Sequence, residues 1–168
     1  MSTPPPDAIT GEVPEGTPVI TQVSRWVPAG AALPSLTKHT SFEQSVAYSG
    51  FPYGWVEGGA RAMWVNSHTD PEDARRHGQP DALVQGLCSA AYISELCTDF
   101  FGPSWITTGR LSTAFIRPVI VRDTITASGL VKRLEEAEGG RKRLWLDVWC
   151  KNQRGELTTV GRASALVE

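Results

Sequence analysis

The sequence predicts an α+β fold in which an antiparallel sheet curves around one long buried helix. Residues 82–101 contain no proline and a single glycine, and their apolar side chains are spread so widely that most of the helix surface must be covered. From residue 109 to the C-terminus the hydrophobic period changes to two. Short turns divide that region into strand-length segments, which favours antiparallel pairing over parallel crossovers.

The composition is that of an ordinary globular domain and points to no charged partner. The chain has 168 residues, of which 40% are hydrophobic, and a net charge of −2. This charge gives no electrostatic reason to expect nucleic acid or an anionic membrane as a partner. No apolar stretch reaches the ~20 residues that a membrane-spanning helix needs. The three cysteines lack metal-type spacing, and the N-terminus lacks a signal-peptide pattern. We therefore expect a cytoplasmic protein with reduced thiols and no metal.

The first third of the chain predicts little regular structure. Residues 1–16 are rich in proline and are expected to form a flexible tail, which leaves 17–168 as a single domain. The β-branched run Val19–Val23 predicts a first strand. Residues 33–39 are broken by a proline and form at most an edge strand. Thr40 or Ser41 then caps a short helix, which the Gly-Phe-Pro segment at 50–52 ends.

Residues 53–65 combine glycines with aromatic side chains and predict no regular element. Long irregular segments of this kind often form binding loops or lids. Trp55 and Trp64 therefore have two interpretations: they line a pocket for a bulky acyl group, or they fill the core where the loop folds back.

Two helices follow this loop. Asp70 and Pro71 predict the start of a short helix that ends near His77, because aspartate caps and proline suits the first helical position. Asp81 is then expected to cap the long helix, which Gly102 and the following proline end.

Four strands follow, at 109–119, 123–135, 141–151 and 156–167. In the third, Leu144, Leu146, Val148 and Cys150 alternate with polar and tryptophan residues, which predicts one buried face. Such a sheet has a long edge that must be covered or paired. We therefore expect a homodimer or higher oligomer in which the sheet edges of two subunits meet.

Three stretches of the sequence resemble one protein family. They are Asn66–Ala74, with its His-x-Asp pair; Gln85-Gly86, at the start of the long helix; and Phe115–Val119 followed by Asp123–Ile125. In this order they resemble the MaoC-like hydratases and dehydratases, which are related to the (R)-specific enoyl-CoA hydratases. The resemblance covers roughly residues 33–167 and implies a hot-dog fold.

The resemblance also implies a reaction: addition or removal of water at an enoyl or 3-hydroxyacyl thioester, linked to CoA or to an acyl carrier protein. His68 matches the family's catalytic histidine, a residue type that is suited to acid–base work near neutral pH. Gly86 matches the residue whose backbone N–H polarises the thioester carbonyl. No cofactor is implied. The residues expected to contact substrate are Gln85, Trp55, Trp64, Val84 and Arg117.

The second catalytic group is less directly indicated. The family's aspartate lies five residues before the histidine, a position that Met63 occupies here. Glu57 is the nearest upstream carboxylate and is either the replacement or a solvated loop residue. Asp70 is a second candidate, although its position also suits a helix cap.

Each remaining candidate also has a structural interpretation. His68 would be a hydrogen-bonded residue at a helix start, Gly86 a close-packing glycine, and Gln85 a helix cap. Arg117 would lie on a solvated strand face. Two other functions also stay open. The chain is either a non-catalytic or hetero-oligomeric hot-dog subunit that binds an acyl thioester, or a thioesterase whose carboxylate is Glu95 or Asp99.

Overall fold

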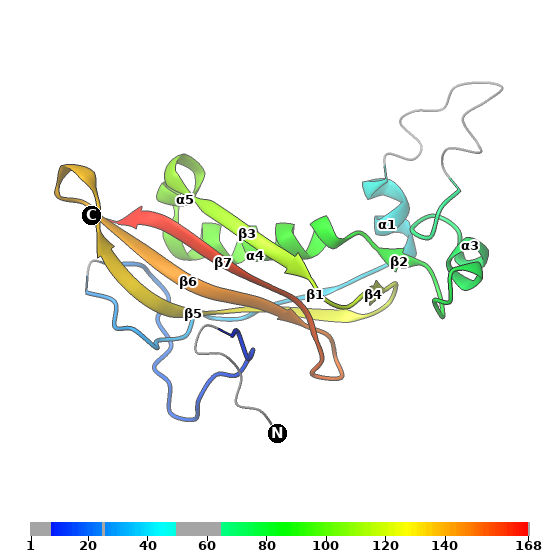
Figure 1. Cartoon of the computed structure of the whole chain (residues 1–168), viewed down its shortest axis with the longest axis horizontal. Coiled ribbons are helices and arrows are strands. Elements are labelled where there is room, and N and C mark those ends of the chain that lie inside the picture. Colours follow the sequence, from blue (N-terminus) through cyan, green and yellow to red (C-terminus); the bar gives the residue numbers. More distant parts are fainter. Residues whose placement is uncertain (1–7, 25, 50–64, 168) are drawn as a thin grey trace.

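The protein forms a curved antiparallel sheet that packs against one long helix, as Figure 1 shows. The computed structural model describes residues 8–24, 26–49 and 65–167. The helix, α4 (Gly86–Phe101), lies along one face of a five-stranded sheet. In spatial order the strands are β1 (Leu36–His39), β5 (Thr124–Glu136), β6 (Lys142–Lys151), β7 (Leu157–Val167) and β3 (Arg110–Phe115). The predicted α+β fold is confirmed.

The core lies between α4 and the inward face of the sheet. Alternate residues of β6 point toward the helix and are fully buried, as the period of two predicts. On α4 the buried positions follow the helical period, so that one face packs against the sheet. The central residues of this core are Ile93, Leu96, Cys97, Phe100, Leu144, Leu146, Val148 and Cys150.

The predicted strand at 109–119 is in fact two strands that belong to different sheets. β3 ends at Phe115, and β4 (Val119–Ile120) pairs with β2 (Leu83–Val84) in a separate two-stranded sheet. The backbone N–H groups of Ile116 and Arg117 both donate to Thr158 O, which breaks the regular ladder. Pro118 follows and has no N–H to donate, so the chain leaves the large sheet here.

The long helix begins four residues later than the sequence predicts. Residues 83–84 are extended in β2, and α4 starts at Gly86. Asp81 does not cap the helix. Its carboxylate instead accepts the Ala82 N–H at 2.8 Å and pairs with Arg122 at 2.8 Å. The pairing of β2 with β4 prevails over helix propensity at these positions.

At its other end α4 stops at Gly102, as predicted, but the chain immediately forms another helix. Pro103 occupies the first turn of α5 (Pro103–Thr108), where its missing N–H costs nothing. The Trp105 side chain of α5 stacks on Phe101, with ring centroids 6.0 Å apart. The proline therefore ends one helix and starts the next.

The predicted caps of the two short helices are confirmed. Ser41 caps α1 (Phe42–Tyr48) and forms a reciprocal capping box with Gln44. Asp70 caps α3 (Pro71–Arg76) by accepting the Glu72 N–H at 2.8 Å. A 3-10 turn, η1 (Glu138–Gly140), connects β5 to β6.

The N-terminal segment does not form the predicted strand at Val19–Val23. Val19 makes only an isolated bridge to Ala32, so no strand ladder forms there. The flexible tail at 1–16 stays a prediction, as does the single domain over 17–168. Within the described part of that tail, Gly11 is buried against Leu157 and Glu12 pairs with Lys151 at 2.7 Å. No helix in the described ranges is long and apolar enough to cross a bilayer.

Burial of α4 predicts a clear difference between two isoleucines on helices. Ile93 is fully buried on α4, whereas Ile106 on α5 is 75% exposed. We expect Ile93→Ala to lower the free energy of unfolding by about 2–5 kcal/mol, because it removes buried methyl groups and leaves a cavity. Ile106→Ala should stay within about 0.5 kcal/mol of the wild type. Urea denaturation followed by tryptophan fluorescence measures both, and equal losses would contradict this packing.

Candidate active site

The candidate site is built around β2, the two-residue strand that leads into α4. Val121 N donates to Ala82 O at 3.0 Å on one side of this segment, next to β4. On the other side Leu83 N donates to Ser67 O at 2.7 Å, which places the His68 segment beside it. β2 is therefore held between the loop that carries His68 and strand β4.

Gly86 is the first residue of α4 and lies under an aromatic ring. A Cβ atom at this position would be 2.8 Å from the ring of Phe115, so only glycine allows this approach. The close-packing interpretation of Gly86 is thus supported by the geometry. Its N–H also belongs to the first turn of a 16-residue helix, where amides have no intrahelical partner and the helix dipole is positive. The packing role and an anion-stabilising role are compatible.

A cavity of about 280 Å³ adjoins this helix start. Val84 and Arg117, two of the residues predicted to contact substrate, are among its lining residues, as is Gly86, which was predicted to polarise the thioester carbonyl. The remaining lining residues are mostly apolar, which suits a hydrocarbon chain better than a charged ligand. They are Leu83, Ser89, Phe115, Ile116, Pro118, Val119 and Thr159.

His68 is not itself a lining residue of the cavity, but its ring is hydrogen-bonded to one. Its backbone N–H donates to Asn66 Oδ1 at 2.8 Å. Its ring Nδ1 lies 3.0 Å from Leu83 O, the carbonyl of a residue that lines the cavity. A carbonyl only accepts, so Nδ1 must carry the proton. In the neutral ring Nε2 then keeps its lone pair and is the basic nitrogen.

Gln85 is oriented toward helix α1. Its amide Nε2 donates to Ser45 O at 3.0 Å and to Ser49 Oγ, and its Oε1 accepts from Ser45 Oγ at 3.1 Å. Gln85 is the N-cap residue of α4, but its side chain forms no capping hydrogen bond. The capping interpretation is therefore not supported.

Sequence reasoning missed Ser45, which is 2% exposed and whose hydroxyl lies within hydrogen-bond distance of three oxygens of the site. The available signal was the spacing of Phe42 and Ser45, which puts the serine on the same side of α1 as Phe42, a residue that packs against the core. A buried serine on such a face requires partners.

The candidate carboxylates are not gathered around His68 in the described part of the chain. Asp70 caps α3, and its other oxygen lies 4.0 Å from the Arg76 guanidinium. Glu95 pairs with Lys38 at 2.7 Å, and neither Glu95 nor Asp99 lines the cavity beside Gly86. Glu57 lies outside the described residues, as do Trp55 and Trp64. Catalytic roles for these residues stay predictions.

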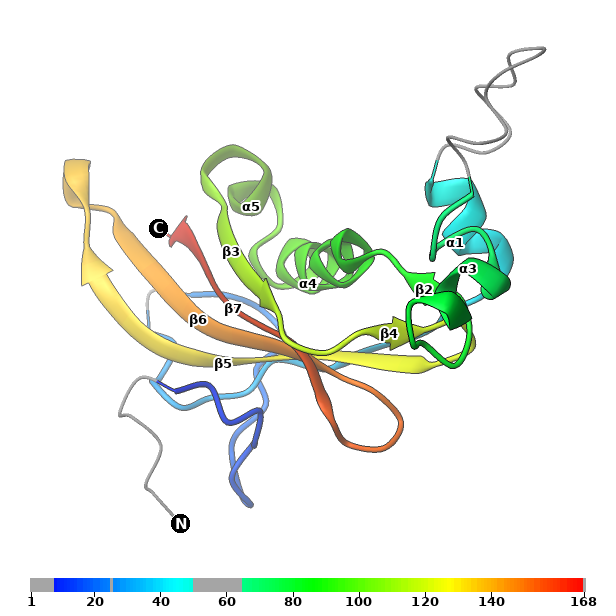
Figure 2. The same cartoon turned by 45° about the vertical axis from the view of Figure 1, so that its right-hand side comes forward.

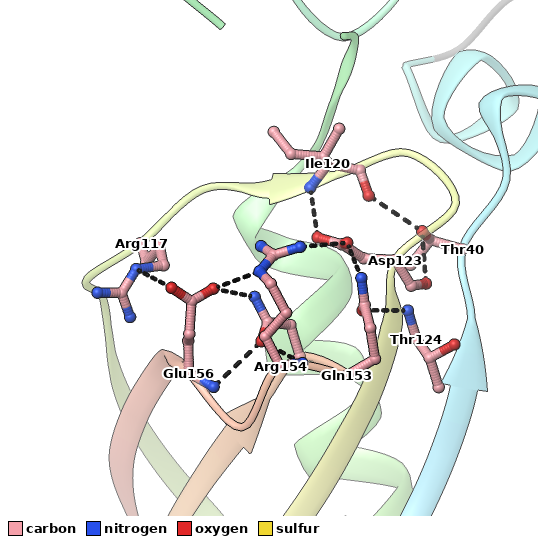
Figure 3. A network of polar contacts seen from close by, with 9 residues as sticks. Thr40, Arg117, Ile120, Asp123, Thr124, Gln153, Arg154 and Glu156 are labelled. Carbon is pink, nitrogen blue, oxygen red and sulfur yellow. Dashed lines mark hydrogen bonds and ion pairs between the residues drawn. The ribbon is translucent and has the colours of Figure 1, made fainter. Parts of the chain in front are cut away.

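Arg117 belongs to a polar network that joins two turns, shown in Figure 3. Its Nη1 donates to Leu157 O at 2.9 Å, and its Nε lies 3.9 Å from Glu156. Glu156 also accepts from Arg154 at 2.8 Å. Hydrogen bonds from Asn152 and Arg154 hold the pKa of the Glu156 carboxyl below its usual value. The positive charge of Arg117 is thus partly balanced before any ligand binds.

Asp123 anchors the same network from the β4–β5 turn. Its buried carboxylate accepts from Ile120 N at 3.0 Å and from Gln153 Nε2 at 2.6 Å. Its backbone O accepts from Thr40 Oγ1 at 2.9 Å, which connects the turn to the end of β1. This residue stabilises the frame around the cavity rather than supplying chemistry.

The thiols do not provide a nucleophile. Burial raises the pKa of Cys97 and of Cys150 to about 12, and it also raises the pKa of Cys88. All three are therefore protonated at neutral pH. Across residues 8–24, 26–49 and 65–167, no three His, Cys, Asp or Glu side chains are grouped as metal ligands would be.

The fold is shared with known hydratases and dehydratases. No family model and no curated protein matches the sequence. An (R)-hydratase from A. caviae involved in PHA biosynthesis matches with a TM-score of 0.65 and 20% identity, over 86% of this chain and 100% of that one. A MaoC-like dehydratase from Rhodospirillum rubrum matches with a TM-score of 0.66 and 18% identity, over 84% and 92%.

A third similar structure is a complex. The C-terminally truncated HadBC (3R-hydroxyacyl-ACP dehydratase) complex from Mycobacterium tuberculosis matches with a TM-score of 0.56 and 17% identity, over 78% of this chain and 90% of that chain. These matches confirm the predicted hot-dog fold and the structural resemblance to MaoC-like dehydratases and (R)-hydratases.

The raised thiol pKa values predict a loss of stability at alkaline pH. An unfolded cysteine ionises near pH ~8.5, whereas Cys97 and Cys150 in the fold retain their protons to about 12. Below the unfolded pKa both states are protonated. Above it only the unfolded chain releases protons, so the free energy of unfolding falls as pH rises toward 12.

Urea titrations across this pH range measure the effect, and a Cys97→Ala variant should show a shallower fall. A thiol-reactive dye provides a second readout. All three cysteines should react in the unfolded chain but not in the native protein, since each is buried. Rapid native labelling would contradict the assigned burial.

Proposed function

We propose that this protein is a hydratase or dehydratase of the MaoC-like type. It adds water to an enoyl thioester or removes it from a 3-hydroxyacyl thioester, linked to CoA or to an acyl carrier protein. The observation that carries the proposal is the fixed tautomer of His68. The Leu83 carbonyl holds the proton on Nδ1, so Nε2 is the basic nitrogen of a ring that is bonded to a cavity-lining residue three positions before the start of α4.

In the hydration direction, His68 Nε2 removes a proton from water as the water oxygen bonds to C3 of the enoyl group. The electron pair of the double bond moves toward the thioester carbonyl, whose oxygen develops negative charge. The Gly86 N–H at the positive end of α4 is suited to stabilise that charge. The proton that Nε2 took from the water is then returned to C2, which completes the addition and restores the neutral imidazole. Dehydration is the same sequence reversed.

The shape and lining of the cavity support an acyl thioester as substrate. Leu83, Val84 and Phe115 present hydrocarbon surface close to Gly86. An acyl chain placed there would bring its thioester to the start of α4. Among the described lining residues Arg117 is the one with a charged side chain, and it is suited to meet a polar part of the thioester carrier.

A subunit role in a two-component enzyme is the second candidate. Among the described residues, no carboxylate is hydrogen-bonded to His68, and Asp70 is turned toward α3. A partner chain that supplies the missing carboxylate would complete the site. The similarity to the HadBC complex agrees with this possibility.

We also propose that the protein assembles through strand β3. This strand pairs with β7 on one side only and is an edge of the sheet. Leu87, Phe115 and Ile116 are exposed near the end of β3 and the start of α4. Pairing β3 with the same strand of a second copy would extend the sheet and cover these side chains.

Replacement of His68 tests the proposed chemistry. We expect the wild type to consume the ultraviolet absorbance of enoyl-CoA substrates, and His68→Ala to lower kcat by about 10²–10⁴-fold, because the base is removed. His77→Gln is the matched control, since His77 is exposed at the end of α3. Equal activity of wild type and His68→Ala would remove His68 from the mechanism.

Two further readouts distinguish the alternatives. Release of free thiol, detected with a colour reagent, would indicate a thioesterase instead. Inactivity of the purified wild type, followed by activity after co-expression with a second hot-dog chain, would favour the two-component enzyme.

A charged substitution at Leu87 tests the assembly. Leu87 is 61% exposed in the isolated chain and lies in the first turn of α4. Leu87→Asp should weaken dimerisation by about tenfold or more, because an unpaired charge would be buried in the interface. An aspartate suits a helix N-terminus, so the fold itself should persist. Sedimentation equilibrium measures the change.

Val19→Asp serves as the control, since Val19 is equally exposed but lies near the opposite, β5 side of the sheet. A wild type that sediments as an 18.2 kDa monomer at micromolar concentration would contradict the assembly proposal.

A further inference from the structure

Ser45 occupies a position that its helix alone does not explain. It lies in α1, is only 2% exposed, and has three oxygen atoms within hydrogen-bond reach of its hydroxyl. Leu83 O is at 2.8 Å, and His68 O and Gln85 Oε1 are both at 3.1 Å. These oxygens come from three separate segments: the His68 loop, strand β2, and the cap of α4.

Each of these three atoms is an acceptor, and the serine hydroxyl has one proton to donate. Without that proton the three oxygens would face one another in a buried space and repel. The hydroxyl is therefore the common donor that allows the segments to meet. Its shortest contact is to Leu83 O, which is also the acceptor for His68 Nδ1. The carbonyl that fixes the histidine ring is thus itself held from α1.

Gln85 keeps this arrangement in one orientation. Its amide nitrogen donates to Ser45 O at 3.0 Å and to Ser49 Oγ. With the nitrogen so placed, Oε1 must face the Ser45 hydroxyl, 3.1 Å away, where it shares the single hydroxyl proton with Leu83 O. The Gln85 side chain thus contacts both the backbone O and the hydroxyl of Ser45. These contacts join the C-terminal half of α1 to the N-cap residue of α4.

We propose that Ser45 and Gln85 are positioning residues that hold His68 in its Nδ1-protonated tautomer and orientation. Neither is a catalytic residue: they act through Leu83 O and the backbone of the His68 loop. The consequence for catalysis rests on the proposed acid–base role of His68. The effect of Ser45 and Gln85 on the His68 tautomer does not rest on that role, and it is measured separately.

The tautomer of His68 is read from the ¹⁵N chemical shifts of its imidazole ring. The chain has three histidines, so His39→Gln and His77→Gln variants assign the remaining signals to His68. Spectra are recorded at alkaline pH, where the rings are neutral. In the wild type we expect Nδ1 protonated and Nε2 unprotonated. Ser45→Ala should shift His68 toward the tautomer ratio of the urea-unfolded chain.

The control separates loss of this hydroxyl from general weakening of α1. Ser41→Ala removes the N-cap of the same helix but leaves the Ser45 hydroxyl in place. It should retain the wild-type His68 shifts, and Ser45→Thr, which keeps a hydroxyl, should also retain them. Wild-type shifts in Ser45→Ala, or the same change in Ser41→Ala, would overturn the proposal. If Ser45→Ala does not fold, Gln85→Met replaces it in the test. This variant should shift His68 toward the tautomer ratio of the unfolded chain, and wild-type His68 shifts in it would overturn the proposal.

Kinetics test the catalytic consequence. If the wild type hydrates enoyl thioesters, Ser45→Ala should lower kcat by about 10–100-fold, because the base is misplaced, while KM changes less than about threefold. An unchanged kcat alongside a shifted tautomer would overturn the positioning role in catalysis. An inactive wild type would contradict the proposed function alone, since the NMR result still decides whether Ser45 and Gln85 set the tautomer.

Discussion

The two-residue strand β2 is the constraint on which the rest of the site depends. Peptide groups of an extended chain point alternately to opposite sides. Ala82 O therefore faces β4, while the N–H and C=O of Leu83 face the His68 loop and α1. Helix α4 begins two residues after Val84 ends the strand. One short strand thus fixes the histidine, the first amide of the helix and the cavity wall relative to one another.

The contact between Phe115 and Gly86 connects this site to the edge of the large sheet. Phe115 is the last residue of β3, and its ring covers the position where a Cβ at residue 86 would lie. The end of the edge strand therefore forms part of the cavity. A second copy paired along β3 would cover Phe115 and Ile116 and would exclude water from the same place. Assembly and chemistry would then depend on one surface.

The sequence predicted features that depend on local pattern and missed those that depend on distant partners. Ser41 and Asp70 are caps because side chain and backbone N–H are neighbours. The alternation in β6 likewise requires only that one face be buried. By contrast, residues 83–84 belong to a strand because β4, more than thirty residues later, lies beside them. Ser45 gains its role from oxygens at least 23 residues away, which no local pattern contains.

The identity of the group that fixes His68 links the proposed reaction to the proposed assembly. A carbonyl orients the imidazole and sets its tautomer, but it brings no negative charge. When Nε2 takes a proton, the resulting imidazolium therefore has no counter-ion from Leu83. A carboxylate close to the water would both stabilise this cation and help to orient the water. In the described part of the chain Asp70 caps α3 and Glu95 pairs with Lys38, so a carboxylate from the proposed partner, or Glu57 outside the described residues, would have to serve this role.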